Sequence, residues 1–171
     1  GMRFLAQIRE QRGDQAEARE WNRRAEEAHS RTPVGRSMAR LVGPIVERFG
    51  EDPDPEQVRV AAQAGDVVAM TALGMALIQK DDVQEAVRWL TPGAEAGDTL
   101  AMFALGAALT AQGDDDGAGR WLERAAEGGE SVLMDVLGDF AAQTGDENKA
   151  RYWKDRAQQA MAEDDGTSPD A

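Results

Sequence analysis

The sequence contains no cysteine and a single histidine, His29. A chain without thiols forms no disulfide and offers no cysteine as a metal ligand or nucleophile. A Ser–His–Asp triad would have to use His29, which lies at the expected end of a helix, where the helix dipole explains a histidine. We therefore expect no enzyme activity, no metal site and no cofactor. The lack of cysteine fits a reducing compartment, so we expect a cytoplasmic protein.

Long apolar runs are also missing. No stretch approaches the roughly 20 apolar residues that cross a bilayer, and the first residues contain no apolar segment of signal-peptide length. The sequence therefore predicts no membrane span and no secretory leader.

Basic residues are scarce, with 19 Lys and Arg against 32 Asp and Glu and a net charge of −13. Binding to nucleic acid needs a basic track for the phosphates, so we exclude nucleic acid as a partner. The charge is uneven, because residues 1–40 hold nine Arg against six acidic residues. We interpret the acidic remainder as a solvated surface, with basic partners as the alternative.

What the sequence does contain is a repeat with a period of 32 residues. A Leu-Gly pair and a tryptophan recur three times in this register. Each repeat also has a Met and an Ala at fixed positions and a turn in which Gly is followed by Asp or Glu. The repeated positions are Met70, Leu73, Gly74, Ala86 and Trp89; Met102, Leu105, Gly106, Ala118 and Trp121; and Met134, Leu137, Gly138, Ala150 and Trp153.

Each repeat reads as two helices joined by a turn. In the repeat at 98–128, apolar residues recur at helical spacing on both sides of Gly113, and Asp114 offers an N-cap to the second helix. We call the helix with the Leu-Gly pair helix A and the helix with the tryptophan helix B. One hairpin cannot bury its apolar face alone, so the hairpins must stack. The predicted fold class is therefore all-α, a helical-hairpin solenoid of about five repeats.

We place the hairpins at about 2–28, 36–64, 66–96, 98–128 and 130–162, in one repeat domain of residues 1–162. The second repeat is degenerate, with helices at 36–49 and 56–64 and Gln57 in the tryptophan position. A break at His29–Gly35 and Asn22 at a packing position predict that the first hairpin is loosely joined. Residues 163–171 have no apolar content except alanine and are predicted to be a disordered acidic tail.

Several residues were assigned packing roles. Trp89 and Trp121 are expected to be largely buried, and Trp153, in the terminal repeat, less so. Leu90 and Leu122 are expected to pack on the following repeat, and Lys154 in the same position marks the end of the array. The run Asp114–Asp116 resembles a calcium loop only superficially, and we interpret it as helix capping.

The patterns Ala-x-x-x-Leu-Gly, Ala-x-x-Trp and Ala-Glu-x-Gly resemble those of Sel-one-like repeats, a branch of the tetratricopeptide repeat superfamily. The Gly-rich loop usual between the two Sel-one-like helices is missing here, and Leu77, Leu109 and Ala141 replace the usual tyrosine. The resemblance implies a right-handed superhelix that binds proteins or peptides without a cofactor.

The candidate site is the concave face that this superfamily lines with helix A residues. We expect a peptide with an apolar segment and a basic end, with Phe103 as its main anchor and Asp135 and Asp139 as ligands for its Arg or Lys. The interpretation left open is that several of these residues pack against neighbouring helices. Two other functions stay open, a self-assembling homo-oligomer and an accessory ligand-sensing domain. The predicted face consists of Val68, Thr71, Met75, Ile78, Leu100, Phe103, Ala107, Thr110, Val132, Asp135, Asp139 and Gln143.

Overall fold

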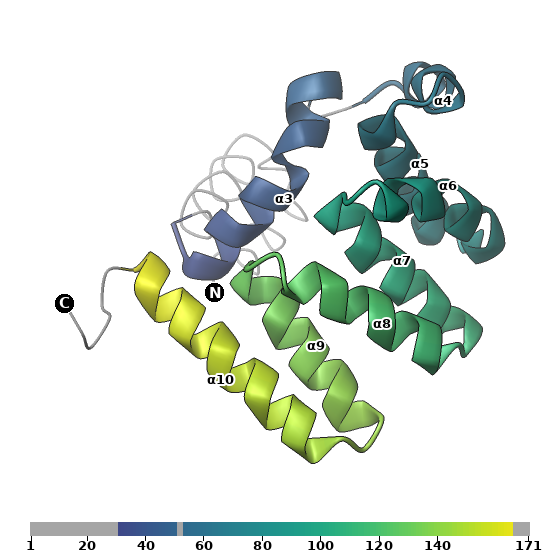
Figure 1. Cartoon of the computed structure of the whole chain (residues 1–171). Helices are drawn as coiled ribbons and strands as arrows, with labels where there is room; N and C mark the ends of the chain where they lie inside the picture. The colour runs from purple at the N-terminus through teal and green to yellow at the C-terminus, as the bar shows by residue number, and fades with distance from the viewer. Residues whose placement is uncertain (1–30, 51–52, 166–171) are drawn as a thin grey trace, which may run out of the picture.

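The protein is built from helices packed in sequence order, as a computed structural model of residues 31–50 and 53–165 shows (Figure 1). This described part contains eight helices and no strand, which confirms the predicted all-α, helical-hairpin solenoid. The helices are α3 (Pro33–Phe49), α4 (Pro55–Gln63), α5 (Val67–Gln79), α6 (Val83–Glu95), α7 (Thr99–Gln112), α8 (Asp115–Ala126), α9 (Ser131–Gln143) and α10 (Glu147–Asp164).

The turns between repeats are built from a glycine and an acidic residue. Gly65 and Gly97 have φ of 92° and 95°, a left-handed conformation that glycine adopts without strain. The following Asp66 and Asp98 are the N-caps of α5 and α7, and their carboxylates accept the amide hydrogens of Ala69 and Ala101. Each cap satisfies a backbone donor that has no partner within the helix.

In the hairpins α5–α6 and α7–α8, a leucine of helix B lies directly on the glycine of helix A. A Cβ atom built on Gly106 would lie 2.7 Å from Cγ of Leu122, and Gly74 is approached in the same way by Leu90. Leu90 and Leu122 therefore cover the glycine of their own hairpin, not only the following repeat as expected. The glycine is required because any side chain would push the two helices apart.

The order of burial among the tryptophans is the reverse of the expectation. Trp153 is only 7% exposed, whereas Trp89 and Trp121 are partly exposed. Trp153 belongs to the main apolar cluster, while the Trp121 ring lies under the guanidinium of Arg124, 4.8 Å away, at the surface. Terminal position alone does not expose a side chain here, because α10 packs along the whole length of α9 (Figure 1).

Two predicted boundaries are wrong. Helix α3 begins at Pro33, inside the stretch predicted as a break, because Thr32 caps it by accepting the amide hydrogen of Gly35. Helix α10 includes Glu163 and continues to Asp164, so the first residues of the predicted tail are helical. The first predicted hairpin, with Asn22 and His29, and residues 166–171 of the tail lie outside the described residues.

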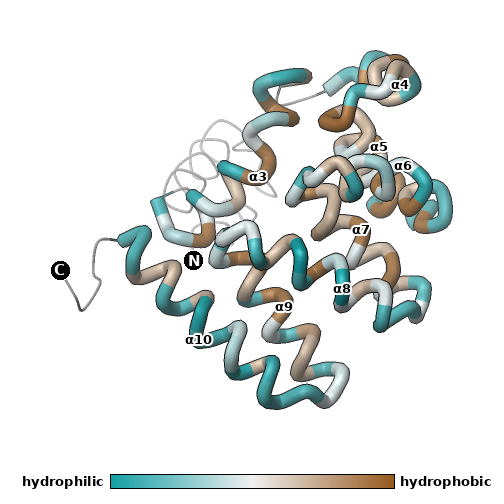
Figure 2. The backbone as a smooth tube through the Cα atoms, viewed as in Figure 1, coloured by the Kyte–Doolittle hydropathy of each residue, from teal (hydrophilic) through white to brown (hydrophobic). Residues whose placement is uncertain are grey.

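The helices carry their apolar residues toward one another, and hydrophilic residues predominate along α10 (Figure 2). The largest fully buried aliphatic side chains are Leu90, Leu105 and Leu137, one in each of the three complete hairpins. Among the described helices, none combines the length and the apolar composition needed to cross a bilayer.

Candidate functional site

The predicted site residues all lie on α5, α7 and α9, and we call the surface that these helices form the A-helix face. Their exposure differs widely. Thr71 and Leu100 are 1% and 4% exposed, so both predicted contact residues are buried in this structure. Partly buried are Val68, Met75, Ile78, Phe103, Val132 and Asp135; exposed are Ala107, Thr110, Asp139 and Gln143.

Helix α3 lies across the A-helix face. It packs against α5, α7, α9 and the end of α10 (Figure 1), although the sequence predicted that it would form a hairpin with α4. Its buried Leu41 belongs to the same apolar cluster as the partly buried Met75, Phe103 and Val132 of that face. Met38, Val42 and Ile45 add to this contact, so α3 presents an apolar stripe at helical spacing. The predicted groove is therefore occupied by the chain itself.

A cluster of polar contacts holds the N-terminal half of α3. The carboxylate of Glu130 accepts a hydrogen bond from Ser37 Oγ at 2.5 Å and pairs with Arg40 at 3.0 Å. Glu130 is the N-cap residue of α9, but its side chain makes no capping bond. Its longer side chain reaches α3 instead of turning back to its own helix, as the aspartates at the other repeat turns do.

The end of α10 completes this cluster. Arg36 pairs with Asp164 at 2.8 Å and with Asp165 at 2.6 Å, and Arg40 lies 3.5 Å from Asp164. The hydrogen bond from Arg36 holds the pKa of Asp164 below its ordinary value. Helix α3 is thus tied to residues more than 120 positions away, which joins the start of the described chain to its end.

The C-terminal end of α3 is held more simply. Arg48 pairs with Asp66, the N-cap of α5, at 3.2 Å. The pKa of Asp66 is lowered mainly by the amide hydrogen bond from Ala69, and the Arg48 guanidinium contributes further. The acidic N-cap residues of α5 and α9 thus each pair with an arginine of α3. Arg48 pairs with Asp66 and Arg40 with Glu130.

Asp135 and Asp139, the predicted ligands for a partner's cation, already have one within the chain. Lys154 of α10 places its ammonium 2.8 Å from Asp135 and 2.6 Å from Asp139. Burial opposes the charge of Lys154, but the two carboxylate hydrogen bonds outweigh burial and raise its pKa. Its aliphatic part lies on Gly138, as Leu122 lies on Gly106. A partner's cation would therefore have to share or displace Lys154 to reach Asp135 and Asp139.

The sequence also holds a signal for the position of α3. In the 32-residue register, Val42 stands where Gly74, Gly106 and Gly138 stand in the later repeats. A valine there prevents the close contact that a leucine of helix B makes with the glycine of helix A. Without this glycine, α3 packs less closely against a helix B than α5 does, which favours burial of its apolar stripe on other helices.

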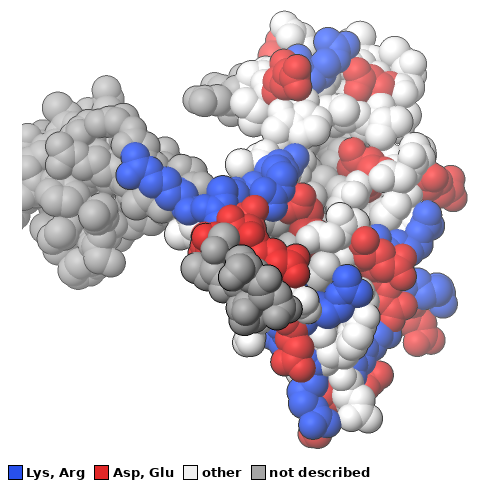
Figure 3. Space-filling view, turned by 60° about the vertical axis from the view of Figure 1, so that its left-hand side comes forward, with Lys and Arg blue, Asp and Glu red and all other residues white. Residues whose placement is uncertain are grey.

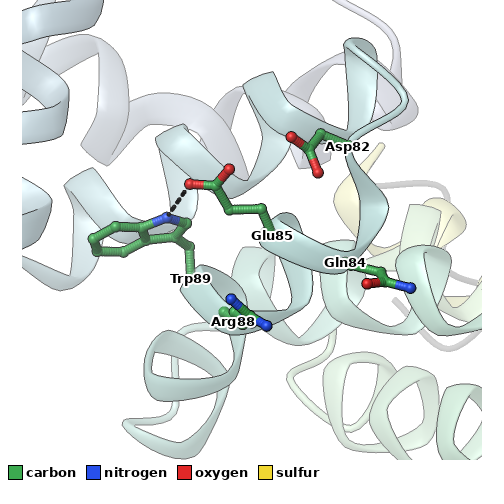
Figure 4. Close-up of a pocket in the computed structure, with 5 residues that line it drawn as sticks. All are labelled: Asp82, Gln84, Glu85, Arg88 and Trp89. Carbon is green, nitrogen blue, oxygen red and sulfur yellow. Dashed lines mark hydrogen bonds between the residues drawn. The ribbon is translucent and has the colours of Figure 1, made fainter.

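Two other candidate sites carry no chemistry. A surface hollow of about 540 Å³ beside Trp89 is lined by side chains of α6 and its N-cap alone (Figure 4). The indole nitrogen donates to Glu85 at 3.4 Å. In the acidic run, Asp114 accepts the amide hydrogen of Gly117 at 2.9 Å, which confirms helix capping. The described residues include no group of three or more His, Asp or Glu side chains arranged to hold a metal ion.

Acidic and basic side chains are interspersed on the face shown in Figure 3 and do not gather there into a field of one sign. The arginines of α3 thus contact particular carboxylates and not a general acidic surface. The A-helix face is thus covered by one amphipathic helix, α3, with Arg36 and Arg48 toward its two ends. No protein-family profile matches this chain, and no curated protein sequence matches it significantly.

Proposed function

We propose that the chain is a protein-interaction module of the Sel-one-like type, whose A-helix face binds an amphipathic helix of a partner. The observation that supports this is the seating of α3 across α5, α7 and α9. Grooves that accept amphipathic helices recognise apolar residues at helical spacing, and α3 has such a stripe. A partner with a similar stripe and a basic end would make the same contacts, without any catalysis.

In this proposal α3 is the occupant that a partner replaces. The apparent affinity for a partner falls by the fraction of molecules in which the face is open, so α3 sets a threshold for binding. The ion pairs of Arg36 and Arg40 lie near the surface, with side chains 32% and 50% exposed, so solvent weakens both pairs. The apolar contacts of Leu41 and its neighbours provide the larger part of the holding energy.

The test uses a fluorescent peptide of residues 31–50 added to the full chain. A release variant, Arg36→Gln with Arg40→Gln and Leu41→Ala, weakens α3 and leaves the A-helix face unchanged. We expect the peptide to bind the release variant at least about tenfold more tightly than the parent. A peptide with Leu41→Ser is the apolar control, and one with Arg40→Glu should bind about fivefold more weakly because it loses the pair with Glu130.

Equal binding to parent and release variant, or equal binding of the three peptides, would contradict the proposal. Light scattering on the same samples addresses the alternative of self-assembly. Helix α3 contacts helices remote in sequence, so two copies that exchange α3 would form a dimer. A dimer that the release variant loses would favour the self-assembling oligomer over peptide binding.

A further inference from the structure

A second apolar surface, separate from the A-helix face, lies between α4 and α5 at one end of the helix array (Figure 1). We call it the α4–α5 groove. Its volume is about 200 Å³, and Val58, Leu73, Leu77 and Pro53 provide much of its apolar lining. This volume is below that of a typical small-molecule site and suits a single large apolar side chain.

The groove exists because α4 is short. It has nine residues, whereas α6 has 13 and α8 has 12. In repeat register, α6 and α8 begin at the equivalent of position 51, but α4 begins at Pro55. Consecutive helices joined by short turns run antiparallel, so the first turn of a helix B covers the C-terminal half of the next helix A. The described residues of that turn, Pro53 and Asp54, are not helical.

Equivalent residues in α5 and α7 show the effect. Ala108 of α7 is 0% exposed and Leu105 is 1% exposed. Their counterparts one repeat earlier, Ala76 and Leu73, are exposed and partly exposed. The following repeat buries these two positions of helix A, whereas the α4–α5 groove leaves Leu73 and Ala76 accessible.

The charge around the groove identifies the kind of occupant. Arg59 and Lys80 line it, and no other charged side chain is found among the described residues of the lining. Within the described part of the chain, neither cation forms an ion pair.

From these observations we infer that the α4–α5 groove binds a partner protein through one large apolar side chain flanked by Asp or Glu. The apolar side chain loses its water against Val58, Leu73 and Leu77, which provides the affinity. The flanking carboxylates meet Arg59 and Lys80, which selects acidic segments and orients them. The inference is independent of the proposed function, because α3 and the A-helix face take no part in it.

The experiment titrates two probe peptides into isotope-labelled full-length chain and follows amide chemical shifts. The acidic probe is acetyl-Asp-Glu-Leu-Phe-Asp-Glu-amide, and the basic probe replaces each acidic residue by lysine. The acidic probe is expected to shift the amides of Leu73, Ala76, Leu77 and Lys80. Lys80→Glu is expected to weaken it by about fivefold, as for the loss of one exposed ion pair. Ala76→Trp fills the groove and is expected to abolish the shifts.

Arg120→Glu, an exposed residue of α8, is the matched charge control and should leave binding unchanged. The inference is overturned if the groove amides do not shift at about 1 mM acidic probe, a concentration that detects even weak binding. It is also overturned if both probes bind equally, or if Lys80→Glu has no more effect than Arg120→Glu. The free chain should also be checked for dimers. If it forms a dimer that Ala76→Trp dissociates, the occupant of the groove is a second copy of the chain and not an acidic partner.

Discussion

Replacing Gly106 with alanine tests the close contact between α7 and α8, the two helices of the middle complete hairpin. The new Cβ would lie 2.7 Å from Cγ and 2.8 Å from Cδ2 of Leu122, a side chain only 4% exposed that has little room to move. Gly→Ala in a helix interior by itself stabilises by about 1 kcal/mol, while overpacking a core costs about 1–3 kcal/mol. Because these atoms are closer than normal contacts, we expect a net loss of about 1–2 kcal/mol.

Gly138→Ala is the matched control in the last hairpin. Its Cβ would meet Cγ of Lys154 at 2.8 Å, but this side chain is flexible and 34% exposed. It can move into solvent at the cost of its pairs with Asp135 and Asp139, about 0–1 kcal/mol each when exposed. The helix-propensity gain of about 1 kcal/mol roughly offsets that loss, so we expect stability close to that of the parent.

Urea unfolding followed by tryptophan fluorescence and circular dichroism measures both variants, and agreement of the two probes checks cooperative unfolding. Adding Leu122→Ala to Gly106→Ala gives a double-mutant cycle, with an expected coupling of at least about 1 kcal/mol because the alanine methyl fills part of the space left by the leucine. If Gly106→Ala were as stable as the parent, or matched Gly138→Ala, the close contact would not be what limits residue size at this position.

Three further predictions concern other parts of the fold. Trp153→Ala should cost about 3–5 kcal/mol and Trp89→Ala less, since Trp153 is 7% exposed and Trp89 is partly exposed; urea melts compare them. Asp114→Ala removes the cap of α8 and should cost about 1 kcal/mol, measured against Asp115→Ala, which makes no capping bond. The lowered pKa of Asp66 means that its contribution to stability is present above its ordinary value of 3.8 and is lost as pH falls through the folded-state pKa. Acid unfolding below about pH 4 should therefore be shallower in Asp66→Asn, and an unchanged pH profile would argue against this role.

The repeat, its helices and its turns could be predicted because their causes lie close together in the chain. A left-handed glycine followed by an acidic cap ends one helix and starts the next, and Asp98 with Gly97 shows this within two residues. The Leu-Gly pairs and the leucines of helix B likewise identified the faces of the hairpins, because spacing within a helix determines which side chains share a face.

The candidate site could be predicted only in part. Register placed the predicted residues on α5, α7 and α9, but it did not show that Leu100 is core or that Lys154 already satisfies Asp135 and Asp139. From its position the sequence predicts only that Lys154 marks the end of the array. Its long aliphatic chain covers Gly138 while its ammonium reaches the surface, a dual behaviour that the sequence position alone does not reveal.

By itself, then, the sequence determined the helices, their turns and the stacking of the later hairpins, since these follow from local capping and from apolar spacing. Only the tertiary structure decided where α3 lies. Its apolar stripe fits either a hairpin with α4 or the A-helix face. In the structure it lies on that face, where Arg36 pairs with Asp164 and Arg40 with Glu130. These partners are about 90 to 128 positions apart in sequence. Such pairs can form only after the intervening helices have stacked, because closing so long a loop costs conformational entropy.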